Sequence, residues 1–198
     1  NLGSNVNSTE SEYFPTLSIQ SDELIFTRRL NDRNEDFFSS DLSAGNWGKA
    51  QPIAGDVNTP QSEAAQTISS DGQWLIFTAY GRQEGYGNYD LYFSQLNAFG
   101  WGKAINLGGL VNSDQWDSQP CFSPDNRVVY FASGRAGGFG GSDIYVCHLL
   151  TESSGKANGR WTEPENLGPG INTSGDDQCP FIHADNQTLY FTSNGWPG

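Results

Sequence analysis

The residues most able to do chemistry in this sequence are carboxylates, and one acidic position recurs four times along its 198 residues. It is occupied by Glu12, Glu63, Asp117 and Asp177. Carboxylates gathered at one place bind cations or partner groups, and two of them in unlike environments can hydrolyse a glycoside. The same side chains also accept backbone N–H bonds where a chain enters a strand, which suits a position repeated throughout the sequence. Both the binding and the structural interpretation stay open at this stage.

Two further sets of aspartates recur. The first set falls in tight turns, which such side chains stabilise by bonding their own backbone. Its members are Asp22, Asp71, Asp125 and Asp185. The second set precedes aromatic residues and is expected to tie loops together, with calcium binding as the minor alternative. Its members are Asp36, Asp90 and Asp143. No other cofactor is expected.

The sequence contains three cysteines, Cys121, Cys147 and Cys179. An odd number cannot pair fully within one chain. Buried free thiols are therefore expected, with a Cys121–Cys179 bridge as the alternative. No CxxC pair occurs, and His148 and His183 are the only histidines, so we expect no zinc site.

Enzyme motifs are scarce. No nucleophile elbow of the Gly-x-Ser-x-Gly type is present. The glycine-rich stretch 137–141 has neither a Lys-Ser/Thr pair nor a predicted helix after it, so it is expected to be a loop between strands. A glycosidase using the recurrent carboxylates is the one enzyme class left open. Four equivalent copies argue against it, because a catalytic residue is needed once.

The carboxylates belong to a long internal repeat. An asparagine preceding each of them, at positions 7, 58, 112 and 172, recurs at intervals of 51, 54 and 60 residues. Each copy then carries a turn aspartate and a short apolar run, such as Leu75-Ile76-Phe77-Thr78. The first three copies also contain an acidic–aromatic segment and a tryptophan run, beginning at Trp47, Trp101 and Trp161.

Each complete copy predicts four short strands and almost no helix. A repeat of about 50–60 residues with four strands has the size of a β-propeller blade. The apolar runs fit strands buried on both faces, as in stacked blades. We therefore expect an all-β propeller of four-stranded antiparallel blades, at about 4–54, 55–107, 108–167 and 168–198. A β-sandwich is the alternative, but it does not predict a repeat of this length.

Residues 123–145 contain Ser-Pro-Asp, then Val-Tyr-Phe-Ala-Ser, then Gly-Gly-Phe-Gly-Gly-Ser-Asp-Ile-Tyr. This pattern resembles the WD40-like Pro-Asp repeat of TolB-like propellers, which occurs in many bacterial cell-envelope proteins. The glycine-rich form is most similar to the version fused to OmpA-like domains, including components of type IX secretion and gliding. The resemblance covers nearly the whole chain. The first copy departs most, because Ser21-Asp22-Glu23 replaces Pro-Asp-Gly and residues 28–35 replace the glycine loop.

The fourth copy contains only its first two strands, so three complete blades and half of a fourth are expected. Asn1-Leu2-Gly3 aligns with residues 106–108 and 166–168, which end a fourth strand. We therefore expect this sequence to be a fragment of a larger propeller, with the rest of its own longer chain as one partner.

Charge limits the other partners. The net charge is −13, which disfavours nucleic acid and anionic membrane surfaces, and no apolar run is long enough for membrane insertion. Aromatic residues outside the repeat pattern are candidate partner contacts. They include Trp116, Phe139 and Trp196.

The resemblance implies a non-catalytic scaffold in the periplasm or cell envelope of a Gram-negative bacterium. It would bind other envelope proteins or peptides within a secretion, gliding or peptidoglycan-linked assembly. The alternative is a carbohydrate-binding or glycoside-hydrolysing propeller with the recurrent carboxylates at the mouth of its channel.

Overall fold

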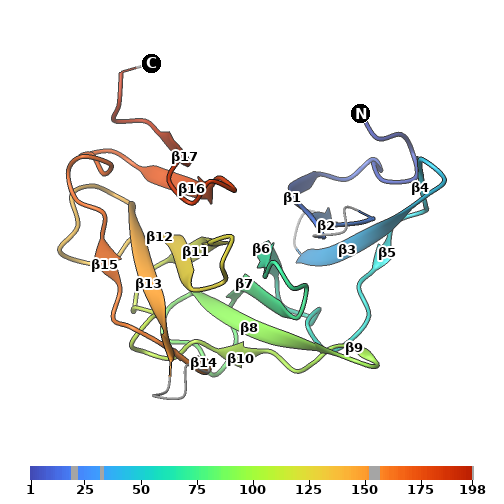
Figure 1. Cartoon of the computed structure of the whole chain (residues 1–198), viewed down its shortest axis with the longest axis horizontal. Helices are drawn as coiled ribbons and strands as arrows, with labels where there is room; N and C mark the ends of the chain where they lie inside the picture. The colour runs from blue at the N-terminus through green and yellow to red at the C-terminus, as the bar shows by residue number, and fades with distance from the viewer. Residues whose placement is uncertain (19–21, 32–33, 152–156, 198) are drawn as a thin grey trace.

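The computed structural model describes residues 1–18, 22–31, 34–151 and 157–197, and it confirms an all-β fold. Within these residues every regular element is a strand. No helix long and apolar enough to cross a membrane occurs in this described part of the chain. The strands form three five-stranded antiparallel sheets and one two-stranded sheet, which follow one another along the sequence (Figure 1).

The strands have the following bounds. The first sheet contains β1 (Glu12–Leu17), β2 (Glu23–Leu30), β3 (Asn34–Ser43), β4 (Asn46–Trp47) and β5 (Gln51–Pro52). The second contains β6 (Glu63–Ile68), β7 (Trp74–Tyr80), β8 (Tyr89–Asn97), β9 (Gly100–Trp101) and β10 (Ile105–Asn106). The third contains β11 (Asp117–Phe122), β12 (Val128–Ser133), β13 (Asp143–Thr151), β14 (Ala157–Trp161) and β15 (Glu165–Asn166). The last contains β16 (Asp177–Ile182) and β17 (Leu189–Ser193).

Each complete sheet is a blade whose predicted fourth strand is broken into two short pieces. In the second blade both pieces pair with β8, where Trp101 lies opposite Leu96 and Ile105 lies opposite Phe93. The broken strand therefore carries one more residue than β8 between these two pairs. An extra residue of this kind bends a strand and increases its twist. The four predicted strands thus become five elements without a change in topology.

Blades stack face to face and build the core between them. Ile25 and Phe37 of the first blade share one apolar cluster with Leu75 and Phe77 of the second. The rings of Phe37 and Phe77 meet edge to face, with their centroids 5.3 Å apart. A second cluster joins the second and third blades in the same way through Leu91. Burial on both faces of the second strand of each complete blade confirms the propeller rather than the sandwich.

Asparagine clamps also join neighbouring blades. Oδ1 of Asn112 accepts the backbone N–H of Leu91 at 2.8 Å, and its Nδ2 donates to the carbonyl oxygen of Leu91 at 3.0 Å. Asn58 grips Phe37 in the same way, and Asn172 grips Ile144. Each clamp bonds the backbone N–H and C=O of one residue on the third strand of the preceding blade. These are the asparagines that mark the sequence repeat.

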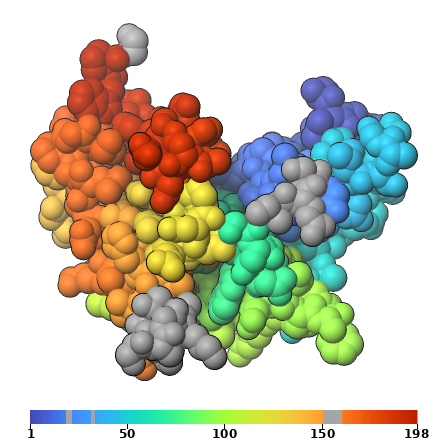
Figure 2. Space-filling view, viewed as in Figure 1, coloured from blue at the N-terminus to red at the C-terminus, as the bar shows by residue number. Residues whose placement is uncertain are grey.

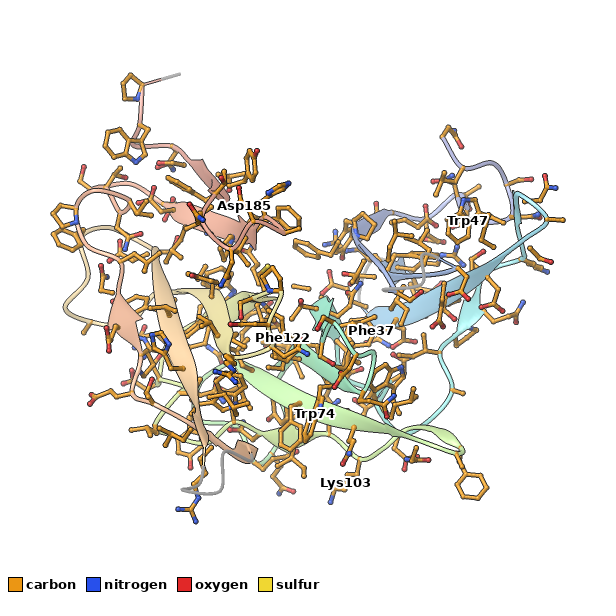
Figure 3. All side chains as sticks on the ribbon, viewed as in Figure 1. Phe37, Trp47, Trp74, Lys103, Phe122 and Asp185 are labelled. Carbon is orange, nitrogen blue, oxygen red and sulfur yellow. The ribbon has the colours of Figure 1, made fainter. Side chains whose placement is uncertain are left out.

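The first strands of the blades, β1, β6, β11 and β16, surround the centre of the ring (Figure 1). In the space-filling view a notch separates the fourth blade from the first (Figure 2). Figure 3 shows Phe122 near the middle of the ring and Lys103 at its outer edge. The ring is therefore an arc around a channel, open between β17 and the N-terminal segment.

Each inner strand contains a bulge at its third residue. Four residues other than glycine have a positive φ of 51–57° there: Phe14, Ala65, Gln119 and Cys179. The strand register breaks at the same place in every blade. The N–H groups of Ala65 and Gln119 donate to the threonine hydroxyl of the preceding blade, each at 3.3 Å. At Ala65 and Gln119 the residue with the strained backbone therefore also makes a hydrogen bond to the preceding blade.

Candidate functional site

The four recurrent carboxylates occupy the first residue of β1, β6, β11 and β16, at one rim of the channel. The side chains of Glu63, Asp117 and Asp177 are fully buried, and that of Glu12 is nearly so. Each accepts the backbone N–H and the hydroxyl of a serine or threonine four residues earlier. The carboxylates therefore fasten the loop that enters each blade. Any role for them in binding a partner remains a prediction.

Three of these carboxylates also form buried ion pairs with arginines. Oε1 of Glu63 lies 2.8 Å from Nη2 of Arg82, and Oδ1 of Asp117 lies 2.7 Å from Nη2 of Arg135. Glu12 pairs with Arg28 at 2.9 Å. Removing one partner from such a pair leaves an uncompensated buried charge, which is strongly destabilising.

The arginines also pack on aromatic rings and bond the backbone. The guanidinium of Arg135 lies 4.8 Å from the ring centroid of Tyr145, and it donates to the carbonyl oxygen of Val111 at 2.6 Å. Arg82 makes the same two kinds of contact with Tyr92 and with the carbonyl of Val57. Sequence reasoning missed these arginines. Their recurrence 16–19 residues after the carboxylate was the available signal.

The fourth carboxylate differs from the other three. Oδ2 of Asp177 accepts bonds from Thr173, but its buried Oδ1 has no hydrogen-bond partner among the described residues. Gly195 stands where the arginine of the third blade stands. Nε1 of Trp196 instead donates to the carbonyl of Ile171 at 2.8 Å, the bond that the arginine makes to Val111 in the third blade. The tryptophan replaces the backbone bond of the arginine but not its charge.

Burial raises the pKa of one channel-rim carboxylate, Glu63, and of one aspartate of the second recurrent set, Asp90. Burial raises the pKa of Glu63 above its ordinary value, and this effect exceeds the opposing hydrogen bonds from Thr59 and Arg82. Burial also raises the pKa of Asp90, although its carboxylate accepts the N–H groups of Tyr86 and Gly87. Desolvation is thus the dominant influence at both positions.

Aspartates of the second recurrent set close the glycine loops. Oδ1 and Oδ2 of Asp143 accept the N–H groups of Gly140 and Phe139, and Asn166 donates its amide to Oδ2. Asp36 makes a simpler bond with Asn34. Within the described residues no cluster of three or more histidine, cysteine or acidic side chains has the arrangement of a metal site.

The three cysteines are free thiols. Cys121 and Cys147 are buried, and burial raises the pKa of the Cys147 thiol to about 12. Cys121 and Cys179 both line the channel without forming a bridge. Buried, protonated thiols are poor nucleophiles, which gives them a packing role.

The predicted aromatic contacts lie on loops of the third and fourth blades. Trp116 is half-buried, whereas Phe139 and Trp196 have about half of their side-chain surface exposed. The glycines beside the last two, Gly140 and Gly195, both pack closely on the loop at Thr173. Phe139 and Trp196 therefore flank one loop between the third and fourth blades. Their role as contacts remains a prediction.

A pocket of about 410 Å³ lies at the channel mouth between the first three blades. We call it the mouth pocket. Its exposed walls are Tyr80 and Tyr89, whose ring centroids are 4.8 Å apart, together with Arg29. Tyr13 and Glu35 complete the polar side. The sequence repeat does not indicate this pocket. Recurrent bulge positions such as Phe14, Ala65 and Gln119 line part of it, but its tyrosines and its Arg29–Glu35 pair are not shared among the repeats.

One hydrogen-bonded group orders the polar side of the mouth pocket. The hydroxyl of Tyr13 donates to Oε1 of Glu35, and Nη2 of Arg29 donates to the same oxygen at 3.1 Å. Burial, and next the adjacent Glu35 carboxylate, raise the pKa of Tyr13 to about 12. The guanidinium of Arg29 also lies 5.7 Å from the ring centroid of Tyr13. The pocket therefore combines aromatic surface with a partly exposed cation.

A larger cavity of about 780 Å³ runs along the channel itself. Its walls come from all four inner strands and are mainly apolar. They include Phe14, Leu17, Ile68, Phe122, Phe181 and Ile182.

No family model matches the sequence, and no curated protein matches it. Solved structures do match the fold. TolB from Acinetobacter baumannii has a TM-score of 0.59 and 17% identity, over 94% of this chain and 39% of its own. The α-L-arabinofuranosidase from Lactobacillus brevis has a TM-score of 0.56 and 10% identity, over 94% of this chain and 65% of its own. The tricorn protease has a TM-score of 0.54 and 12% identity, over 89% of this chain and 18% of its own.

At these identities the likeness establishes the fold alone. The described sheets form a TolB-like β-propeller arc. The chain spans 39% of the length of the TolB structure that it matches.

Proposed function

We propose that this chain is a protein-binding propeller of a bacterial cell-envelope protein and acts as a non-catalytic scaffold. The mouth pocket carries the proposal, because Tyr80, Tyr89 and Arg29 expose the residue types that dominate protein–protein hot spots. The neighbouring recurrent carboxylates are engaged inside the blades. In this proposal the partner is therefore bound by the exposed side chains of Tyr80, Tyr89 and Arg29.

The partner in this proposal is a protein or peptide with basic or polar character. The net charge of −13 steers positively charged partners toward the propeller and repels nucleic acid. Such a peptide would pack an apolar or aromatic side chain against the exposed surface of the Tyr80–Tyr89 pair. An acidic group on it would meet Arg29, which is about half exposed.

The envelope location rests on the TolB-like fold. The finer proposal is an OmpA-family protein of a secretion, gliding or peptidoglycan-linked assembly, as the Gly-Gly-Phe-Gly-Gly-Ser-Asp-Ile-Tyr segment suggests. Cell fractionation of the producing bacterium with an antibody against this chain tests the location. Recovery in the cytosol would overturn it, whereas recovery in the periplasm with isolated peptidoglycan would support the finer form.

Site-directed photo-crosslinking tests the binding site. A photoreactive amino acid replaces Tyr80 in the full-length protein in its own cells, and a matched replacement of exposed Phe99 on the outer loop is the control. The proposal requires a crosslinked protein at the first position and none at the second. That protein, once purified, must bind the wild type and lose at least tenfold affinity for Y80A and R29A. Equal binding to all variants would refute the site.

Carbohydrate binding or hydrolysis is the second candidate. The Tyr80–Tyr89 pair next to Glu35 offers a stacking surface with a carboxylate, and an arabinofuranosidase shares the fold. Titration with an arabinoside and sialoside panel, together with turnover of nitrophenyl glycosides, separates the two candidates. Turnover that disappears in E35Q would replace the scaffold with a glycosidase. Absence of both binding and turnover would remove the second candidate.

A further inference from the structure

One position near the end of the second strand differs in residue type between the three complete blades. In each blade it directly follows the residue that pairs with the recurrent carboxylate, and it is occupied by Arg29, Tyr80 and Gly134. Arg29 lies opposite Glu35 on the third strand. Tyr80 lies opposite Tyr89 in the same way. Equivalent positions therefore present an ion pair, an aromatic pair and a small residue, and the blades hold this varied chemistry on a constant scaffold, as binding sites require.

Tyr80 and Tyr89 offer ring surface and hydroxyl donors that the fold itself does not use. They are 45% and 37% exposed, and neither hydroxyl bonds another described residue. The hydroxyl of Tyr13, in contrast, is engaged by Glu35. Burial, and next the charge of Glu35, raise the pKa of Tyr89, so its hydroxyl keeps its proton at neutral pH. Both hydroxyls can therefore donate to acceptors on a bound chain.

The backbone on both sides of the tyrosine pair is fixed by hydrogen bonds. The N–H of Tyr80 donates to the carbonyl oxygen of Ser62 at 2.9 Å, and the N–H of Gly81 donates to that of Asn88 at the same distance. Tyr89 forms a parallel bridge with Trp116 of the next blade. The pair is thus already positioned in the absence of a ligand, which lowers the cost of association.

An aromatic surface with unused hydroxyl donors suits a proline-rich segment. A polyproline II helix has no internal hydrogen bonds, so its carbonyl oxygens are available, and such segments dock in aromatic-lined grooves. Next to the tyrosines, the side chain of Arg29 is 47% exposed, whereas that of its partner Glu35 is only 19% exposed. The exposed cation favours an acidic residue beside the prolines. The net charge of −13 favours basic residues farther along the same segment.

We infer that the mouth pocket binds a polyproline II segment that carries an acidic residue beside its prolines. A proline ring packs on Tyr80 and Tyr89, and the tyrosine hydroxyls donate to carbonyl oxygens of the segment. Arg29 pairs with the acidic side chain. This inference rests on the proposed function, because it names the class of peptide that the same site binds.

A peptide titration tests the inference. The probe is fluorescein-labelled Lys-Lys-Glu-Pro-Pro-Pro-Glu-Lys-Lys, whose two glutamates allow either chain direction, and its anisotropy is followed as the whole chain is added. We expect saturable binding that weakens at least tenfold with Tyr89→Ala. Tyr89→Phe keeps the ring and should lose only the contribution of the hydroxyl. Phe99→Ala, on the outer loop, is the matched control and should bind like the wild type. A peptide with leucines in place of the prolines has the same charge and should bind at least fivefold more weakly.

A double-mutant cycle tests the acidic contact. Arg29→Ala should weaken binding of the glutamate peptide at least fivefold, but that of a peptide with glutamine in place of glutamate by less than about twofold. Additive losses would overturn the assignment of the acidic residue. No saturable binding, equal affinity for the proline and leucine peptides, or wild-type affinity of both Tyr89 variants would overturn the whole inference. If the proline peptide fails to bind while the crosslinked partner still distinguishes Tyr80→Ala from the wild type, the inference is wrong and the proposed function stands.

Discussion

Nη2 of Arg135 lies 2.7 Å from Oδ1 of Asp117, and the carboxylate that it reaches is completely buried. The matching oxygen of Asp177, one blade further along, is equally buried and has no hydrogen-bond partner among the described residues. The chain thus contains a paired and an unpaired version of the same buried carboxylate. The difference follows from Gly195, which stands at the position of the arginine.

This contrast predicts that the same Asp→Asn substitution has effects of different size at the two positions. Asp117→Asn leaves Arg135 without its counter-charge and should lower the free energy of unfolding by about 3 kcal/mol. Asp177→Asn retains an oxygen for Thr173 and removes a charge that no described cation balances, so its effect should stay within about 1 kcal/mol. Urea denaturation of both variants measures this. Equal losses at the two positions would contradict the prediction.

The asparagine clamps predict that the stability of the chain depends strongly on single amide side chains. Asn112→Ala leaves the N–H of Leu91 without its partner, whereas the carbonyl of Leu91 keeps the bond from the N–H of Leu107, and an unsatisfied buried group costs about 1–3 kcal/mol. We expect a loss of about 2 kcal/mol in the free energy of unfolding. Asn97→Ala, in an exposed hairpin loop, should lose less than about 1 kcal/mol and serves as the control.

The backbones of the third and fourth blades approach closely at Gly140, which predicts that this position requires glycine. A Cβ at Gly140 would lie 2.0 Å from the carbonyl oxygen of Gly175, whereas a Cβ at Gly170 would meet nothing within 4 Å. Gly140→Ala should therefore destabilise the chain by about 2 kcal/mol or more by forcing the fourth blade away. Gly170→Ala should be near neutral. Thermal melts compare them, and equal melting temperatures would show that this contact does not hold the fourth blade.

The raised pKa of Glu63 predicts how the free energy of unfolding depends on pH. Its pKa in the folded chain is raised above the ordinary 4.5, so the folded state holds the proton more tightly than the unfolded state. The contribution of Glu63 to stability is then complete below about pH 4.5 and decreases as the pH rises through the folded pKa. The free energy of unfolding of the wild type, relative to E63Q, should therefore fall between pH 4 and the folded pKa and level off above it.

Denaturation curves of the wild type and E63Q across this range provide the measurement, with exposed Glu10→Gln as the control. A wild type that gains stability over E63Q as the pH rises would mean that the Arg82 ion pair, rather than burial, sets the titration of Glu63.

The all-β propeller fold could be predicted from the sequence alone, because the internal repeat has the length and the strand pattern of a propeller blade. Turn aspartates are an example. Oδ1 of Asp71 accepts the N–H of Gln73, and Oδ1 of Asp125 accepts that of Arg127, as the turn pattern predicts. These bonds join residues two positions apart in the sequence, so a local sequence pattern is enough to predict them.

Contacts across the ring were not predictable in the same way. The mouth pocket brings together Tyr13 and Tyr89 from different blades, and neither residue recurs in the repeat. The arginines were missed for a related reason, since Arg28 reaches its carboxylate from within β2 whereas Arg82 reaches it from the following loop. The arginine–carboxylate ion pair therefore forms from two different positions of the repeat. The spacing in the sequence differs between blades, although the pair itself is kept.

The asparagine clamp has a consequence for how such a ring changes over evolutionary time. Asn58 and Asn112 bond the backbone N–H and C=O of one residue and not its side chain, so these bonds set no requirement on the type of that residue. The second, third and fourth repeats each carry, ahead of their first strand, the asparagine that bonds the blade before them. A duplicated blade would therefore carry its own hydrogen bonds to the blade before it, and only the apolar cluster between the two blades would have to adapt.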